Sequence, residues 1–218
     1  MAFLTIESDA PADDSSASGR RRSVALRLDG ETWLRVEPEV LRELGVAAGE
    51  DIDEVRRARV EAALMRVRAR LFVVRSLAVS MQSEAEIAKK LAARYVPPEV
   101  AREAIERVAG YGYIDDASLA GQLARGMRTR GYGRRRAEQK LRQRGLSHEV
   151  SAAALDDSYA GCDEAELALE ALGRRPVSDD VGRRRAVAFL ARRGFSAGAA
   201  WKAVRAAADP EGSGCGER

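Results

Sequence analysis

The chain has 218 residues, of which 45% are hydrophobic, 33% charged and 5% aromatic, and its formal net charge is +3. This length suits one or two ordinary domains, and no apolar run approaches the ~20 residues of a membrane-spanning helix. Two cysteines and a single histidine cannot supply the roughly four nitrogen and sulfur ligands of a zinc site, and no glycine-rich phosphate loop is present. We therefore expect a cytoplasmic protein, because the N-terminus also lacks a signal-peptide pattern, with no cofactor, no metal and no enzymatic activity.

The two ends of the chain differ in composition from the rest. Residues 1–22 are predicted to form a disordered arm, because the stretch from Glu7 onward is too polar to bury a core, and residues 209–218 a flexible tail. Between residues 23 and 56, two alternating apolar runs flank Asp29-Gly30, which is a strong hairpin signal. A short helix closed by Gly45 follows. This segment is predicted to be a small N-terminal α/β appendage made of a β-hairpin and a helix.

From residue 57 the chain is rich in helix-forming residues and repeats with a period near fifty. Leucines and arginines recur in one register, 50 and then 49 residues apart: Leu91, Leu141 and Leu190, and Arg94, Arg144 and Arg193. Each repeat is predicted to contain three helices, over residues 57–114, 115–162 and 163–208. A unit of this size is marginal alone, so neighbours should stack. The predicted fold is all-α, a curved array of three tandem three-helix repeats that follows the α/β appendage.

Residues that favour helix N-termini mark the starts of these helices. Asp115 and Asp116 precede the first helix of the middle repeat. Ser83, and Asp179 or Asp180, are predicted to cap the second helices of the outer repeats.

The charge is distributed unevenly along the chain. Residues 125–144 hold nine Lys and Arg against Glu138 alone, whereas residues 145–173 hold seven carboxylates and no Lys or Arg. A run of three arginines recurs at the second helix of the last repeat. The candidate binding residues are Arg128, Arg130, Tyr132, Arg134, Arg135, Arg136, Lys140, Arg142 and Arg144, with Arg183, Arg184 and Arg185.

Such runs have two interpretations. One is a solvated helix face, and the other is a basic strip that binds a polyanion or an acidic partner. Arginine outnumbers lysine here, which favours binding, because a guanidinium can contact phosphate or carboxylate with two hydrogen bonds.

Three motifs of the chain together resemble the bacterial RecX family, over roughly residues 60–208. They are Gly110-Tyr111-Gly112-Tyr113-Ile114-Asp115-Asp116, Gly133-Arg134-Arg135-Arg136-Ala137 with Leu141 and Arg144-Gly145-Leu146, and Ser83-Glu84-Ala85-Glu86-Ile87. The resemblance implies a regulatory protein of DNA repair, homologous recombination and the SOS response. Such proteins bind the RecA recombinase, lie in the helical groove of the RecA–DNA filament, and inhibit its ATPase, strand exchange and coprotease activities.

On this resemblance, Tyr113, Asp115 and Asp116 lie in an exposed turn and are candidates for direct contact with RecA; helix capping is the alternative for the two aspartates. We expect a monomer whose partners are RecA, the RecA–DNA filament and DNA itself.

Two other functions stay open. A stand-alone DNA-binding module would act through the same arginines on phosphates. A carboxylate nuclease using Asp115, Asp116, Asp156 and Asp157 is disfavoured, because neighbouring residues of a helix point in different directions.

Overall fold

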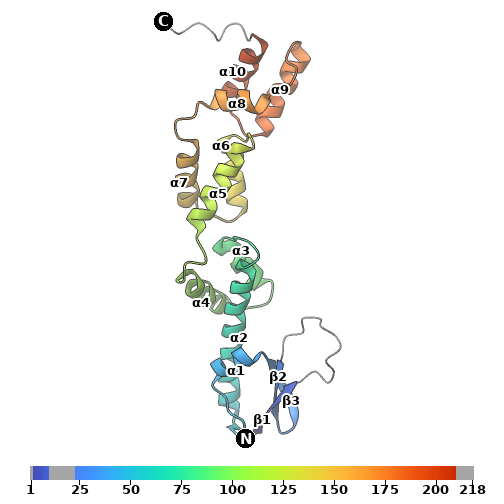
Figure 1. The fold of residues 1–218 in the computed structure, drawn as a ribbon, viewed down its shortest axis with the longest axis vertical. Coiled ribbons are helices and arrows are strands. Elements are labelled where there is room, and N and C mark those ends of the chain that lie inside the picture. The colour runs from blue at the N-terminus through green and yellow to red at the C-terminus, as the bar shows by residue number, and fades with distance from the viewer. Residues whose placement is uncertain (1, 10–22, 210–218) are drawn as a thin grey trace. The chain divides into compact units, whose positions relative to one another are not determined.

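The computed structural model describes residues 2–9 and 23–209, which form four β-strands and ten α-helices (Figure 1). The chain divides into two compact units. Unit 1 consists of Met1–Ala78 and Lys90–Gly110, and unit 2 of Val79–Lys89 and Tyr111–Arg218. In the part of the chain that the structure describes, no helix is both long enough and apolar enough to cross a membrane.

Unit 1 begins with an antiparallel sheet in the order β3-β2-β1-β4. Its strands are β1 (Ala2–Asp9), β2 (Ser23–Leu28), β3 (Glu31–Val36) and β4 (Asp51–Ile52). Asp29 and Gly30 join β2 to β3 with φ values of 50° and 88°. Both lie in the left-handed region that a type I′ hairpin turn requires, which confirms the predicted hairpin.

Strand β1 corrects the prediction of a disordered arm over residues 1–22. Residues 2–9 form a strand between β2 and β4, in which Leu4 pairs with Leu28 and Ile6 with Leu26. Leu4 is fully buried. The strand is stabilised by partners far away in the sequence, and local composition does not reveal such pairing. Residues 1 and 10–22 of the predicted arm, and 210–218 of the predicted tail, lie outside the described residues.

Helix α2 (Glu54–Leu77) joins the sheet to the helical part of unit 1. The carboxylate of Asp53 caps it by accepting the N–H of Arg56 at 2.6 Å. Its buried Val60 and Leu64 pack in one core with the inner face of the sheet and with α1 (Pro38–Leu44). Its other neighbour is α4 (Pro98–Ala109). The predicted boundary after residue 56 therefore falls within the first turn of a helix that serves both the sheet and the first three-helix group.

Helix α3 (Glu84–Ala92) begins with a capping box. The Ser83 hydroxyl accepts the N–H of Glu86 at 3.1 Å, and the Glu86 carboxylate accepts the N–H of Ser83 at 3.1 Å. Ser83 is therefore the predicted cap. Of the two aspartates predicted for the last repeat, Asp179 caps its helix, by accepting the N–H of Gly182 at 2.8 Å.

Unit 2 contains two further groups of three helices (Figure 1). They are α5 (Asp116–Thr129), α6 (Arg134–Gln143) and α7 (His148–Tyr159), then α8 (Glu164–Leu172), α9 (Asp180–Arg192) and α10 (Ala197–Ala208). Each group surrounds a small core with many alanines, in which Leu141 and Leu190 occupy equivalent, fully buried positions. The helical groups predicted from the fifty-residue period are thus present.

The C-terminal end of α6 packs onto the start of α3. Gly145, with φ 74°, ends α6, and a Cβ at this position would lie 2.5 Å from the Cβ of Ala85. The carbonyl of Arg144 accepts a hydrogen bond from the Ser83 hydroxyl, and the Arg144 guanidinium donates to the Glu86 carboxylate at 2.8 Å. Only glycine at position 145 allows this close approach.

The C-terminal end of α9 packs onto the start of α6 in the same way, 49 residues later. A Cβ at Gly194 would collide with the backbone of Arg136. The N–H of Gly133 donates to the carbonyl of Arg193 at 2.9 Å, and the Arg193 guanidinium donates to the carbonyl of Arg130 at 2.7 Å.

These two contacts, which we call the helix joints, place α9, α6 and the start of α3 head to tail. At each joint, the carbonyl end of one helix meets the N–H end of the next. Helix ends carry unpaired carbonyl and N–H groups and opposite partial charges, so each joint satisfies groups that would otherwise need water or a side chain.

Replacing Gly133 by alanine is expected to destabilise the protein by about 1–3 kcal/mol, because the new Cβ would lie 2.6 Å from the carbonyl oxygen of Gly194. Gly126 is a matched control, since no atom lies within 4 Å of its Cβ position inside α5. Gly126→Ala should therefore stabilise by about 0.5–1 kcal/mol. Urea unfolding followed by circular dichroism measures both. Shifts of the same sign would contradict the tight joint.

Asp116 also supports the start of α3 and gives a pH-dependent prediction. Its carboxylate accepts the N–H of Glu84 at 3.2 Å. Burial raises the pKa of Asp116 above its ordinary 3.8, against the opposing effect of this hydrogen bond, and the charges of Glu86 and Asp115 raise it further. The folded state therefore favours the protonated form, so this contribution to stability is present below the unfolded-state pKa and is lost as pH rises through the folded-state value.

Asp116→Asn should raise the thermal midpoint relative to wild type at about pH 7, with a difference that shrinks as the pH falls toward ~4. Asp116→Ala, which also removes the acceptor for the N–H of Glu84, should be less stable than the asparagine variant at every pH. Thermal unfolding across this range measures both differences. A constant gap between Asp116→Asn and wild type would show that the carboxylate is not destabilised by its surroundings.

Candidate partner and nucleic-acid interface

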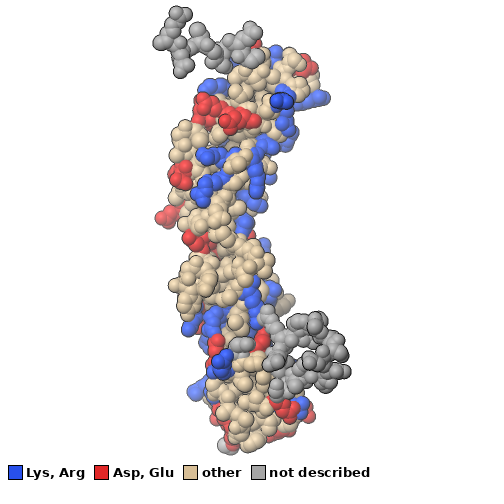
Figure 2. All heavy atoms as spheres, in the orientation of Figure 1, with Lys and Arg blue, Asp and Glu red and all other residues tan. Residues whose placement is uncertain are grey.

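Exposed cations without a partner gather on the second helices of unit 2. Among the cations of α6 and α9, six have neither a side-chain hydrogen bond nor an ion pair with the described residues, and we call them the basic strip: Arg135, Lys140 and Arg142 on α6, and Arg184, Arg185 and Arg192 on α9. In Figure 2, Lys and Arg follow unit 2 on the side of α6 and α9, whereas Asp and Glu gather over α7 and α8.

The buried face of α6 determines which of its cations are exposed. Ala137 and Leu141 are fully buried. Arg135 and Arg142 are two helical turns apart and form one exposed row, while Lys140 lies in a second row. These side chains extend into solvent from a rigid element, which suits contact with an anionic surface.

The first turn of α6 is electrostatically unfavourable for a helix. Arg134, Arg135 and Arg136 occupy it, and it contains no acidic residue. A helix N-terminus carries a positive partial charge that disfavours cations. Three arginines in this turn therefore lower the stability of the helix itself.

Two of these three arginines have partners within unit 2. Arg134 forms an ion pair with Asp156 at 2.6 Å, and Arg136 donates to the side-chain oxygen of Gln139 at 2.6 Å. Both pairs are exposed, so an incoming phosphate or carboxylate can compete for these guanidiniums, but only Arg135 is without a partner.

Three other predicted arginines are held by the fold. Arg128 donates to the carbonyl of Ser158 at 2.7 Å, and Arg144 is part of a helix joint. Arg183 lies 3.5 Å from Asp180 and also donates to a backbone carbonyl. Arg130 differs, because its side chain is exposed and makes no contact of this kind with the described residues.

Tyr132 packs inside unit 2. Its carbonyl accepts the hydroxyl of Tyr159 at 2.8 Å, and the Arg193 guanidinium lies 4.9 Å from its ring centre. Burial raises the pKa of Tyr159 to about 12, with Arg128 and Arg134 opposing the shift. The Tyr159 hydroxyl therefore stays protonated and keeps its hydrogen bond. The ring of Tyr132 is thus partly buried, with the Arg193 guanidinium over one face.

The turn before α5 contains both exposed side chains and side chains that hold the start of a helix. Tyr113 is 66% exposed. Asp115 caps α5 by accepting the N–H of Ser118 at 2.8 Å, and Asp116 holds the start of α3. Asp115 therefore has the capping role that was the alternative to RecA contact, while Tyr113 and the equally exposed Tyr111 are side chains of this turn that a partner could reach.

The aspartates of the nuclease alternative each take part in a contact within the fold. Asp156 pairs with Arg134, and Asp157 lies 3.9 Å from Arg125. The described part of the chain holds no group of three or more His, Cys, Asp or Glu side chains that could bind a metal ion.

Two features were missed by the sequence analysis. Arg192 belongs to the basic strip; the sequence places it in the basic block of the last repeat, with Arg183–Arg185 and Arg193, but it was not among the candidate binding residues. The helix joints were missed as well, although the pair Arg-Gly recurs 49 residues apart, at Arg144-Gly145 and Arg193-Gly194. The repeated glycine, next to the more conspicuous arginines, was the available signal.

Family models and curated relatives agree on what this chain is similar to. The first three-helix domain of RecX matches residues 69–107, and the second matches residues 115–155. The regulatory protein RecX of Xanthomonas campestris pv. campestris (strain B100) is 39% identical over 118 residues, which are 52% of this chain and 71% of that protein. The regulatory protein RecX of Thermobifida fusca (strain YX) is 33% identical over 152 residues, 66% of this chain and 81% of that protein.

Solved structures show the same fold. A crystal structure of regulatory protein RecX matches with a TM-score of 0.63 and 24% identity over 91% of this chain and 97% of that chain. RecX from Lactobacillus salivarius matches with a TM-score of 0.56 and 16% identity over 67% of this chain and 97% of that chain. The identity and coverage of these sequence relatives show that the chain belongs to the RecX family of non-enzymatic regulatory proteins.

Proposed function

We propose that this protein binds RecA and the RecA–DNA filament in the helical groove and inhibits the ATPase, strand exchange and coprotease activities of RecA. Family membership supports the partner. The observation that carries the site is the basic strip, whose six exposed cations have no carboxylate partner among the residues described.

In this proposal the protein acts as a monomer, and its helical repeats, over residues 57–114, 115–162 and 163–208, form a curved array that follows the groove. The helix joints give the array a direction and a spacing. Helix α6 has ten residues and is therefore about 15 Å long, so the strip presents cations in clusters roughly one helix length apart. A groove lined by phosphates and acidic side chains can engage several clusters at once.

The chemistry of the strip suits anions without sequence selectivity. Arg135 and Arg142 can each bind a phosphate or a carboxylate through two parallel hydrogen bonds. No aromatic side chain accompanies them on the exposed face of α6. Contacts of this kind position a protein on DNA and do not read bases, so inhibition should be independent of DNA sequence.

The same strip supports a second candidate, a stand-alone DNA-binding module. A protein that neutralises six to ten phosphates of bare DNA loses about 10³–10⁵-fold in affinity between 50 and 200 mM salt. Titration of single-stranded and duplex DNA across this range separates the candidates. Tight, steeply salt-dependent binding to bare DNA supports the second, and weak binding to bare DNA together with tight binding to the RecA filament supports the first.

The strip variant Arg135→Ser/Arg142→Ser/Arg184→Ser/Arg185→Ser tests the proposal. We expect that half-inhibition of DNA-dependent ATP hydrolysis by RecA of the same species requires a concentration of this variant at least about tenfold higher than that of wild type. The reason is that each exposed charge contact contributes about 0.2–1 kcal/mol to binding. The control replaces Arg59, Arg107, Arg174 and Arg205 by serine; all four are exposed, make no ion pair within the described residues and lie outside the strip.

The control should inhibit like wild type. If wild type does not slow ATP hydrolysis, the proposed function is wrong. If wild type inhibits and the strip variant inhibits equally well, the function stands and the assignment of the strip is wrong.

A further inference from the structure

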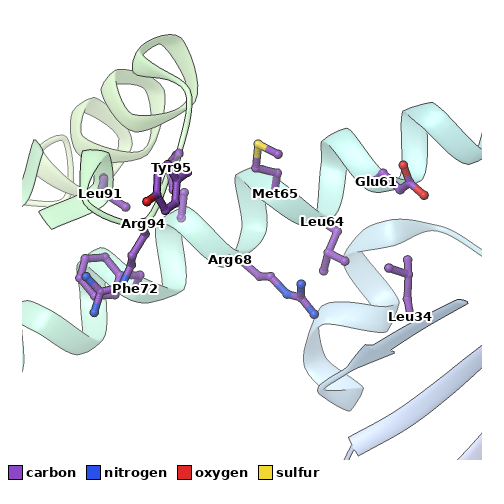
Figure 3. Close-up of a pocket in the computed structure, with 11 residues that line it drawn as sticks. Leu34, Glu61, Leu64, Met65, Arg68, Phe72, Leu91, Arg94 and Tyr95 are labelled. Atoms are coloured by element: carbon purple, nitrogen blue, oxygen red, sulfur yellow. The ribbon is translucent and has the colours of Figure 1, made fainter.

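Unit 1 contains a hollow of about 400 Å³ along helix α2 (Figure 3). Its apolar lining consists of Leu34, Leu64, Met65, Phe72, Leu91 and Val96. On α2 the lining extends from Glu61 to Phe72, a distance of about 16 Å at 1.5 Å per residue. The hollow is therefore an elongated apolar groove, built from residues that take no part in the basic strip.

Two guanidiniums line this groove, and backbone carbonyls hold both in place. Arg68 donates to the carbonyl of Arg35 at 2.8 Å. Arg94 donates to the carbonyl of Lys90 at 3.0 Å and lies over the ring of Phe72 at 4.0 Å from its centre. Neither arginine pairs with a carboxylate in the described ranges. Both positive charges are oriented and uncompensated.

The one carboxylate of the lining is already neutralised. Glu61 accepts the indole N–H of Trp33 at 2.8 Å and a hydrogen bond from Arg57 at 3.2 Å. These two hydrogen bonds, the indole first, lower the pKa of Glu61 below its ordinary value. Glu61 thus cancels Arg57 and leaves Arg68 and Arg94 without a counter-charge.

Along α2 this lack of pairing is unusual. Five of the seven arginines of the helix have a carboxylate partner: Arg56 with Glu50, Arg57 with Glu61, Arg66 with Glu103, Arg70 with Glu43, and Arg75 with Glu37. The other two are Arg59, which does not line the groove, and Arg68, which does. The cation that lines the groove thus donates to a backbone carbonyl but has no carboxylate partner, whereas its neighbours on the helix are mostly paired with carboxylates.

Tyr95 adds an aromatic ring at the end of the groove near Arg94 (Figure 3). Its φ of 58° lies in the left-handed region, and its side chain is 95% exposed. Gly145 and Gly194 occupy the corresponding positions of the later repeats, also with positive φ. A bulky residue in this conformation is an outlier, and such strain is concentrated at functional positions.

From this charge complementarity we infer that the groove binds an acidic, partly apolar peptide segment of a partner protein. One or two aliphatic or aromatic side chains of the segment lie against Leu64 and Met65. Its carboxylates meet Arg68 and Arg94, and the ring of Tyr95 covers the chain. A groove of about 16 Å accommodates about five residues of extended peptide. The largely aliphatic walls favour a peptide over a nucleic acid, whose bases stack on aromatic surfaces.

The probe is a phage-displayed library of random twelve-residue peptides, selected on the immobilised full-length protein. Selected peptides should carry Asp or Glu beside Leu, Met, Phe or Trp. The dominant peptide is then synthesised with a fluorescent label, together with a counterpart in which lysine replaces each acidic residue. Anisotropy titration should show binding of the acidic peptide and at least about tenfold weaker binding of the lysine peptide.

Arg68→Ser/Arg94→Ser should weaken binding of the acidic peptide roughly tenfold, and Arg68→Glu/Arg94→Glu should reverse the preference toward the lysine peptide. Arg59→Ser/Arg107→Ser removes two exposed charges elsewhere in unit 1 and should bind like wild type. Circular dichroism and thermal midpoints identify any variant that fails to fold. Met65→Glu, at a half-exposed position of the groove, then takes the place of the unfolded variant, and we expect it to abolish binding of the acidic peptide.

A library that yields no acidic–apolar consensus would overturn the inference, and so would a selected peptide that binds the groove variants and wild type equally. Direct binding of a labelled 20-residue oligothymidylate that is lost in the groove variants and retained in the control, together with no peptide consensus, would instead assign the groove to single-stranded DNA. None of these outcomes depends on inhibition of RecA, so the groove and the basic strip can fail separately.

Discussion

The rest of unit 2 depends on one interaction, the end-to-end contact between second helices. At one joint the N–H of Gly133 donates to the carbonyl of Arg193, and at the other the Ser83 hydroxyl donates to the carbonyl of Arg144. Every helix end needs partners for its unpaired backbone groups, and here each repeat supplies them for the next. The joints therefore set the register of the repeats, and they bring the exposed faces of α6 and α9 into succession. A basic strip on isolated helices would have no fixed spacing.

The placement of charge shows what this arrangement costs in stability. Three arginines stand in the first turn of α6, where the helix dipole disfavours them. Asp156 on α7 compensates one of the three. The acidic residues between positions 145 and 173 lie on α7 and α8, except for Asp163, which caps α8, and they lie on another side of the unit (Figure 2). The near-zero net charge of the chain thus conceals two surfaces of opposite sign. A protein selected for stability alone would intersperse them.

Local sequence signals predicted the local structure well. Asp29-Gly30 marked the hairpin, Ser83 and Asp115 marked helix starts, and the fifty-residue period marked the three-helix groups. Strand β1 was missed because it is stabilised by pairing with β2 and β4, which its own composition does not record. The candidate site was predicted only as a region. Arg134 and Arg135 are adjacent and alike in sequence, yet Asp156, 22 residues later, engages the first and leaves the second free. That distinction arises from packing between helices.

The left-handed backbone at Tyr95 has a consequence for growth of the repeat. Its counterparts, Gly145 and Gly194, lie so close to the preceding helix that a Cβ has no room, so a tyrosine here cannot form the same joint. At the opposite end, the N–H of Gly182, the counterpart of Gly133, is occupied by the Asp179 carboxylate. Within the chain, the joints therefore link three second helices, α3, α6 and α9. Head-to-tail contacts that stay open can propagate from copy to copy, but neither end of this run repeats the geometry of the joints, since Tyr95 replaces the glycine at one end and Asp179 occupies the N–H of Gly182 at the other.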